Sequence, residues 1–149
     1  PKLVNSYEPT DGVRIVICGM GQVGTGAYDS LVPLWDREVL GVEEMASRVE
    51  HHISKQRRVV TADASDPDFW FRLDFDELKL IMLGLTNQRE NMMVAELLRS
   101  MGYCGELAAV VRHEDDAAEM QAVGISAYNL YAEAGNGFAA HASEKLTPP

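Results

Sequence analysis

Val13–Cys18 reads Val-Arg-Ile-Val-Ile-Cys, and Gly19–Gly24 follows at once as Gly-Met-Gly-Gln-Val-Gly. A short apolar run that leads into a GxGxxG turn is typical of the first strand of a dinucleotide-binding fold and of the start of its phosphate-binding helix. In this pattern Gly19 permits the tight turn, Gly21 lets the backbone approach a pyrophosphate, and Gly24 lets the helix pack close to the strand. We expect phosphates to bind the N–H groups at the helix N-terminus, where the helix dipole favours negative charge.

The rest of the chain alternates short apolar runs with segments of helical periodicity. Strands are predicted at residues 13–18, 39–43, 58–62, 78–85, 107–111 and 127–130, and helices at 22–34, 45–55, from 66, 90–101, 115–123 and 132–145. Strands that alternate with helices are joined by right-handed crossovers. The predicted fold is therefore a Rossmann-like, doubly wound parallel sheet in a three-layer α/β/α arrangement.

The chain has 149 residues, which suits one domain with a core of its own. We expect residues 1–12 to be a linker from a longer protein, residues 13–145 to be the nucleotide-binding domain and residues 146–149 to be a tail. A second, substrate-carrying domain of ordinary size does not fit in this length.

The formal net charge is −10, from 13 basic and 23 acidic residues. This balance argues against nucleic acid or an anionic membrane surface as a partner, so an anionic ligand has to be held by local groups. Only two cysteines occur, Cys18 in a predicted strand and Cys104 in a predicted loop, and a reducing, cytoplasmic setting is the simpler interpretation. No apolar run approaches the roughly 20 residues of a membrane-spanning helix.

An acidic pair, Glu43 and Glu44, ends the second predicted strand about 20 residues after the last glycine of the motif. An acidic side chain at this position binds the ribose hydroxyls of a dinucleotide. A carboxylate there repels a 2′-phosphate, which favours NAD or a plain adenosine nucleotide over NADP. The predicted site includes both residues, with Glu44 as the more solvated of the two.

Two further strand ends are expected at the same edge of the sheet, where open α/β sheets bind ligands. Asp63 and Ala64 follow the third strand, and Leu85 and Thr86 end the fourth. Asp63 suits either of two roles: it accepts a hydrogen bond from the adenine amino group or orients nearby amides, or it belongs to a helix-capping turn built with Ser65. The sequence leaves both roles open.

The histidines and acidic runs do not form a metal-binding pattern. His51 and His52 are adjacent and point in different directions on a helix, and the acidic residues after His113 suit the first turn of a helix. Neither GxSxG, HExxH nor CxxC occurs, and no serine, histidine and aspartate set stands out. We therefore predict neither a catalytic residue nor a bound metal, and we predict that the chain is not an enzyme.

The glycine motif, Glu43, the run Ala62–Pro67 and Asn91 together resemble the TrkA N-terminal domain, also called RCK or KTN, over residues 13–145. This family regulates potassium channels and transporters. Within it, three segments are similar to Kef-type potassium efflux proteins, potassium/proton antiporters whose cytoplasmic part senses glutathione and its adducts; the segments are residues 24–29, 66–70 and 133–139.

The resemblance implies that Gly19, Met20, Gly21, Gln22, Val23, Gly24, Glu43, Glu44, Asp63, Ala64, Leu85 and Thr86 line a site for NAD(H), AMP or a related adenosine nucleotide. It also implies a homodimer, a cytoplasmic location with a tether to the inner membrane through an attached or associated potassium transporter, and sensitivity to glutathione or its adducts. Two positions depart from the family pattern. Glu43 replaces the usual aspartate, and Ala62 replaces the usual glycine before Asp63.

The first functional hypothesis is a regulatory nucleotide-binding module, in which a ligand acts through its different affinities for two conformations. An NAD-dependent oxidoreductase is the alternative, although hydride transfer needs a substrate pocket and a proton donor that the sequence does not offer. A dimerisation scaffold with an empty pocket is a third possibility.

Overall fold

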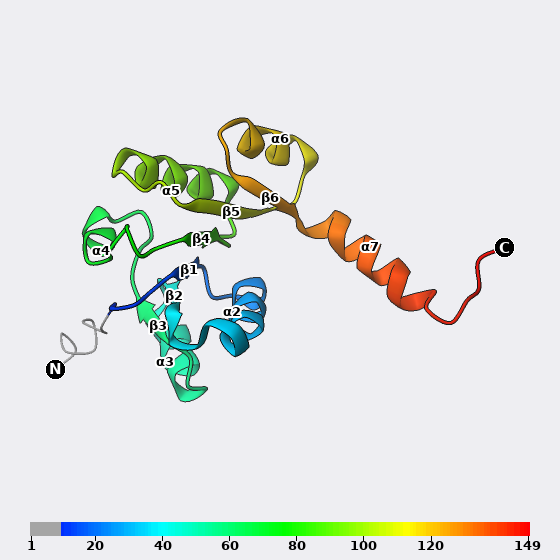
Figure 1. The fold of residues 1–149 in the computed structure, drawn as a ribbon, viewed down its shortest axis with the longest axis horizontal. Helices are drawn as coiled ribbons and strands as arrows, with labels where there is room; N and C mark the ends of the chain where they lie inside the picture. Colours follow the sequence, from blue (N-terminus) through cyan, green and yellow to red (C-terminus); the bar gives the residue numbers. More distant parts are fainter. Residues whose placement is uncertain (1–9) are drawn as a thin grey trace.

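The computed structural model describes residues 10–149, so residues 1–9 of the expected linker lie outside the described part of the chain. Six parallel strands form one sheet in the order β3-β2-β1-β4-β5-β6. The strands are β1 (Ile15–Cys18), β2 (Val39–Glu43), β3 (Val59–Thr61), β4 (Leu80–Leu83), β5 (Glu106–Val111) and β6 (Ser126–Asn129). Helices lie on both sides of the sheet (Figure 1), which confirms the predicted doubly wound α/β fold.

The helices are α2 (Gln22–Trp35), α3 (Ala46–Ser54), α4 (Pro67–Phe71), α5 (Gln88–Ser100), α6 (Glu114–Ala122) and α7 (Leu130–Ala142), with a short 3-10 helix η1 (Asp36–Glu38) after α2. Capping side chains explain why two of them begin two residues earlier than predicted. Asn87 accepts from the backbone N–H of Arg89 and Glu90 ahead of α5. Asn129 accepts from the N–H of Ala132 and starts α7 in the same way.

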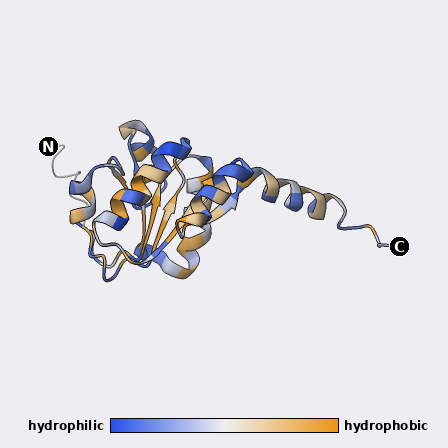
Figure 2. Cartoon of the chain, turned by 90° about the horizontal axis from the view of Figure 1, so that it is seen from above, coloured by the Kyte–Doolittle hydropathy of each residue, from blue (hydrophilic) through white to orange (hydrophobic). Residues whose placement is uncertain are grey.

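The strand alternation divides the buried side chains into two clusters, one on each face of the sheet. Val16 and Cys18 pack with Trp70 of α4 and with residues of α5 and α6. Ile15 and Ile17 point to the other face, where they pack with residues of α2 and α3. The strands form the apolar centre between the helices (Figure 2), as expected for a parallel sheet covered on both faces.

The strand register places the ligand-facing ends at one level. Cys18 of β1 is paired with Val42 of β2 and with Leu83 of β4. The residues that follow these three, Gly19, Glu43 and Gly84, therefore lie side by side at the carboxyl edge, where Glu43 is the last residue of β2. The chain crosses from one face to the other between β3 and β4, and β1 and β4 are neighbours, so these residues lie at the switch point of the sheet.

Helix α7 extends away from the body of the domain (Figure 1). From Tyr131 to the end of the helix every residue is exposed, including Phe138 at 73%. Within residues 10–149 we find no helix that is long and apolar enough to cross a membrane.

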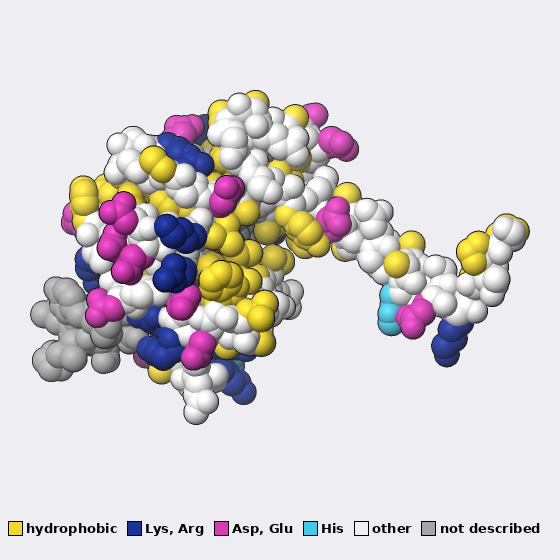
Figure 3. All heavy atoms as spheres, in the orientation of Figure 1, with side chains coloured by type: hydrophobic (Ala, Val, Ile, Leu, Met, Phe, Trp, Pro, Cys, Tyr) yellow, Lys and Arg dark blue, Asp and Glu magenta, His cyan; other side chains and the backbone are white. Residues whose placement is uncertain are grey.

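The face of the sheet that carries α2 and α3 is open over β4, β5 and β6. Met82, Ala108, Val110 and Tyr128 point to this side and are half-buried or exposed, whereas the alternate residues of β4 and β5, on the opposite face, are buried. With Val23 and Ala27 of α2 they line an apolar trough with a cavity of about 360 Å³. Figure 3 shows hydrophobic side chains gathered in this region, between α2 and the base of α7.

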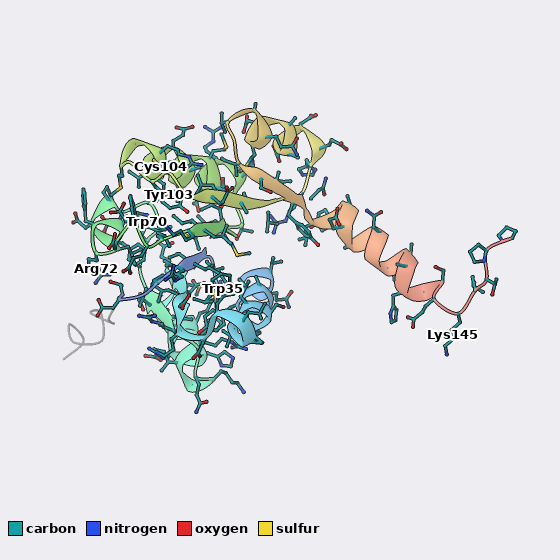
Figure 4. All side chains as sticks on the ribbon, in the orientation of Figure 1. Trp35, Trp70, Arg72, Tyr103, Cys104 and Lys145 are labelled. Atoms are coloured by element: carbon teal, nitrogen blue, oxygen red, sulfur yellow. The ribbon has the colours of Figure 1, made fainter. Side chains whose placement is uncertain are left out.

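The two cysteines differ in exposure and should differ in reactivity. Burial in β1 raises the pKa of the Cys18 thiol to about 12, whereas Cys104 lies exposed after α5 (Figure 4). Since the thiolate is the nucleophile, we expect iodoacetamide at pH 8 to modify Cys104 and not Cys18 in the folded protein. Mass spectrometry of the intact chain should find one added group, and two after denaturation. Two additions without denaturant would contradict the burial of Cys18.

Candidate functional site

A cavity of about 250 Å³ opens at the carboxyl edge of the sheet, above the ends of β1, β2, β3 and β4. It brings together residues that are far apart in the sequence. Its walls are formed by Gly19, Gly21, Val42, Glu43, Glu44, Met45, Arg48, Ala62, Asp63, Ala64, Gly84, Leu85, Thr86 and Glu90. We call it the switch-point cleft.

The glycine turn forms one wall of the cleft. The turn is tight because a side chain at either end, Gly19 or Gly24, would collide with backbone atoms. Gly19 has φ +93, and a Cβ there would lie 2.8 Å from the carbonyl oxygen of Gly84. A Cβ on Gly24 would lie 1.9 Å from the carbonyl oxygen of Gly19. The missing side chain at Gly24 therefore allows the close approach of the Gly19 peptide, and it matters less for the packing of the helix on the strand. At Gly21 nothing lies within 4 Å of an added Cβ, and this residue forms the open rim where α2 begins.

Glu43 is buried at 6% exposure, and both carboxylate oxygens accept from backbone N–H groups. Oε1 accepts from Met20 at 3.2 Å and Oε2 from Met45 at 3.0 Å. Arg48 of α3 lies at 3.8 Å from Oε1. A carboxylate oxygen accepts more than one hydrogen bond, so Glu43 links the glycine turn to the start of α3 and keeps acceptor capacity toward the cleft.

The turn after β3 is held by its own side chain and by the core. Asp63 Oδ1 accepts from the N–H of Ser65 at 2.9 Å and from its hydroxyl at 2.7 Å. The carbonyl oxygen of Ala64 accepts from the indole Nε1–H of buried Trp70 at 2.7 Å. The capping-turn role of Asp63 is therefore present, and the residue also lines the cleft.

A buried amide fixes the end of β4. Asn91 is 1% exposed; its Oδ1 accepts from the Leu85 N–H at 3.2 Å, and its Nδ2 donates to the Leu85 carbonyl at 3.1 Å. Both backbone polar groups of Leu85 are thus hydrogen-bonded to one buried side chain, which fixes the orientation of this peptide segment at the wall of the cleft.

Four predicted site residues do not line the switch-point cleft: Gly24, which lines the apolar trough, and the three residues Met20, Gln22 and Val23. Met20 is 1% exposed and packs its side chain against Gly41 of β2. Gln22 lines a neighbouring cavity between α2 and α3, and Val23 lines the apolar trough. Gln22 and Val23 lie in the first turn of α2, where backbone N–H groups have no partner within the helix. Any role of these three residues in binding therefore rests on the backbone.

Sequence reasoning missed Arg48 and Glu90, which also line the cleft. An exposed arginine on α3 and a glutamate in the first turn of α5 resemble ordinary solvated residues, and only the packing of α3 and α5 beside the strand ends places them here. Arg48 is the one basic side chain among the described residues that line the cleft, against four carboxylates. An anionic ligand has to rely on Arg48 and on backbone N–H groups.

A comparison with protein families decides the family of this chain: residues 15–129 match the TrkA-N domain. The chain belongs to the TrkA-N domain family. The match spans all six strands, and it ends at the last residue of β6.

Solved structures share the fold of this TrkA-N domain. The NAD(P)-binding domain of an exopolyphosphatase-related protein from Archaeoglobus fulgidus superposes with a TM-score of 0.80 at 17% identity and covers 89% of this chain and 98% of its own. The TrkA-N domain of the inner membrane protein ybaL from Escherichia coli gives a TM-score of 0.74 at 18% identity, and the match covers 90% of this chain and 96% of the ybaL domain.

The GsuK channel bound to NAD gives a TM-score of 0.66 at 20% identity and covers 81% of this TrkA-N domain and 23% of the channel chain. The structure of GsuK bound to ADP gives a TM-score of 0.70 at 18% identity, and the match covers 85% of this domain and 34% of the GsuK chain. No curated protein sequence matches the chain.

Proposed function

We propose that this TrkA-N domain is a regulatory module that binds an adenosine nucleotide, NAD(H) or AMP, in the switch-point cleft. The observation that carries the proposal is that the glycine turn and the buried Glu43 carboxylate form adjoining walls of one cavity. Phosphate and ribose recognition are thereby available to a single ligand, with Gly21 at the phosphate end and Glu43 at the ribose end.

The remaining walls suit an adenosine. Glu43 has acceptor capacity for ribose hydroxyls, and its charge disfavours a 2′-phosphate, so we expect NAD to bind better than NADP. Asp63 and Glu44 stand at the rim, and Ala64 and Leu85 provide apolar surface for a base. The GsuK structures with NAD and with ADP support the same ligand class, because their fold is shared by this domain.

Binding is proposed as the function itself, without turnover. The described residues that line the cleft include no histidine, lysine, tyrosine or cysteine, the usual proton donors beside a nicotinamide. This favours the regulatory module over the NAD-dependent oxidoreductase.

We propose further that nucleotide occupancy controls an attached or associated potassium transporter, a potassium/proton antiporter of Kef type, at the cytoplasmic side of the inner membrane. GsuK is a channel and ybaL an inner membrane protein, which supports a membrane partner. The Kef type and the sensing of glutathione adducts rest on the three sequence segments given above; one of them, residues 133–139, lies on exposed α7.

A homodimer is proposed from the open apolar trough and the projecting helix. Parallel sheets are normally covered on both faces, and the trough over β4, β5 and β6 is uncovered in the described chain. Leu130, Ala134 and Phe138 recur at every fourth position of α7 and form an apolar stripe. In a dimer, α7 of each copy would cover the trough of the other.

Phe138→Glu should convert the dimer to a monomer, because it places a charge on the α7 stripe in place of its one exposed aromatic side chain. Phe71→Glu is the matched control: Phe71 of α4 is exposed to the same 73% and lies away from the trough. Sedimentation velocity at equal concentrations should show a monomer for the first variant and a dimer for the second. A monomeric parent protein, or two dimeric variants, would contradict this interface.

The proposed ligand is tested by titrating the protein with NAD, NADH, AMP and NADP in a calorimeter, together with Gly21→Ala. Gly21 has a negative φ of −78 and an extended backbone, and an added Cβ meets no protein atom within 4 Å. The added methyl group would stand at the phosphate end of the cleft. We expect affinity for AMP and NAD to fall about tenfold or more, while the melting temperature falls by only about 2–4 °C because alanine is a poorer N-cap than glycine.

Gly26→Ala is the control, since a Cβ at Gly26 of α2 also meets nothing within 4 Å and Gly26 is not part of the switch-point cleft. Its affinity should equal that of the parent protein. Absence of any nucleotide binding by the parent protein would refute the proposed function. Turnover of NADH with small carbonyl substrates would favour the oxidoreductase instead.

A further inference from the structure

The peptide units of the glycine turn are held from two sides by buried side chains. The Met20 N–H donates to Glu43 at 3.2 Å, as described above. The Met20 carbonyl oxygen accepts from Nε2 of His52 at 2.9 Å and from the hydroxyl of Thr25 at 3.2 Å. His52 is 5% exposed and comes from the last turn of α3.

The partners of His52 define its tautomer. A carbonyl oxygen only accepts, so Nε2 carries the hydrogen that bonds to Met20. Nδ1 faces Nη1 of Arg57 at 3.3 Å, and a guanidinium only donates, so Nδ1 accepts. Arg57 thus selects the form of the ring that can donate to the turn.

Arg57 is itself anchored to α2. Its Nε and Nη2 each lie 2.9 Å from a carboxylate oxygen of Asp29, a two-point contact that also lowers the pKa of Asp29 through the hydrogen bond from Arg57. The chain reverses at Gln56, which has φ +64, and the Arg57 N–H donates to the His52 carbonyl at 3.0 Å. This reversal directs Arg57 back toward α2.

We infer that His52, supported by Arg57 and Asp29, is a positioning residue for phosphate recognition by the glycine turn. The inference rests on the proposed function. The Met20 carbonyl and the Gly21 N–H belong to one planar trans peptide and point in opposite directions. His52 holds the carbonyl on the α3 side, and it thereby directs the Gly21 N–H away from α3, on the rim where a phosphate would bind.

The role predicts a selective defect. AMP and adenosine share the base and the ribose and differ in the phosphate. Loss of the His52 hydrogen bond should therefore weaken the binding of AMP and leave the binding of adenosine unchanged. A residue that only stabilises the fold would weaken both ligands together. The ratio of the two dissociation constants is therefore the readout.

His52→Leu removes both ring nitrogens at similar volume, and we expect AMP to bind about tenfold more weakly while adenosine, measured by NMR titration, binds as before. His52→Gln retains a side-chain N–H at the reach of Nε2 and should restore AMP binding to within about threefold. The Gly21 amide resonance should shift in the leucine variant and return toward its original position in the glutamine variant.

Arg57→Met removes the hydrogen-bond partner of His52 Nδ1 and leaves His52 itself in place. This variant therefore tests the positioning role of His52 even if His52→Leu fails to fold. It should weaken the binding of AMP about threefold and leave the binding of adenosine unchanged. Arg14→Met breaks an exposed ion pair with Glu38 at the opposite edge of the sheet and should change neither ligand. Equal loss of AMP and adenosine, or unchanged AMP binding in both the His52→Leu and Arg57→Met variants, would overturn the inference. A parent protein that binds neither ligand would instead refute the proposed function.

Discussion

Glu43→Ala is expected to weaken NAD and AMP binding about a hundredfold and to lower the stability of the domain at the same time. Hydrogen bonds to a charged group contribute about 1.5–3 kcal/mol each, and a ribose offers two hydroxyls to the carboxylate. The truncation also leaves the buried Met20 N–H without its acceptor, which costs about 1–3 kcal/mol. Calorimetric titration and thermal unfolding measure the two effects separately.

Glu43→Gln separates binding from folding. Its amide oxygen still accepts a hydrogen bond from the Met20 N–H, whereas its NH2 group faces the Met45 N–H and cannot accept. We therefore expect a melting temperature between those of the parent protein and the alanine variant. The negative charge that opposes a 2′-phosphate is gone, so the preference for NAD over NADP should narrow. Glu44→Ala is the neighbouring control; Glu44 is exposed at the rim of the cleft, and we expect its truncation to change affinity by less than about threefold. Full affinity in Glu43→Ala would remove Glu43 from the site.

Gly24→Ala is expected to lower the free energy of unfolding by more than about 3 kcal/mol. The added Cβ would lie 1.9 Å from the Gly19 carbonyl oxygen and 3.4 Å from Ile17, and the close atom is backbone that cannot rotate away. Overpacking costs about 1–3 kcal/mol in ordinary cores and more where the backbone has to move. For a domain of this size the melting temperature should fall by about 10 °C, measured by circular dichroism.

The same substitution two residues later provides the comparison. Gly26→Ala lies in the same helix with nothing within 4 Å of its Cβ, and alanine is the better helix former by about 1 kcal/mol. Its melting temperature should equal or exceed that of the parent protein. If both alanine variants unfold at the parent temperature, the turn is not as tight as the structure has it.

Short sequence patterns were sufficient to predict the fold, because apolar strand runs and helix starts recur in alternation along the chain. The apolar run before Gly19 predicted β1, Asp66 and Pro67 predicted the start of α4, and Asp66 does cap that helix by accepting from the Asp68 N–H. Predicted ends failed where a cap was overlooked: Asn87 and Asn129 start α5 and α7 earlier than hydrophobic periodicity alone suggests. Periodicity reports the buried face of a helix, whereas a cap sets its first residue.

The candidate site was predictable to the extent that it is made of strand ends. Parallel strands present their carboxyl ends at one edge, so Gly19, Glu43 and Leu85 were expected together. The side chains that hold these ends were less accessible to prediction. His52 approaches Met20 from 32 positions away, and a buried histidine on a helix has no sequence signal that distinguishes it from a solvated one.

The parallel α/β fold, the glycine turn and the carboxylate at the end of β2 were predictable from the amino-acid sequence, because each depends on residue types at short spacing. Tertiary structure alone decided that both oxygens of Glu43 are bonded to backbone N–H groups, that Arg48 and Glu90 face the switch-point cleft, and that Arg57 and His52 connect Asp29 to the turn. It also decided that α7 stands apart from the sheet it follows. These features depend on how separate elements pack against each other, and distances between elements are fixed only when the core is formed.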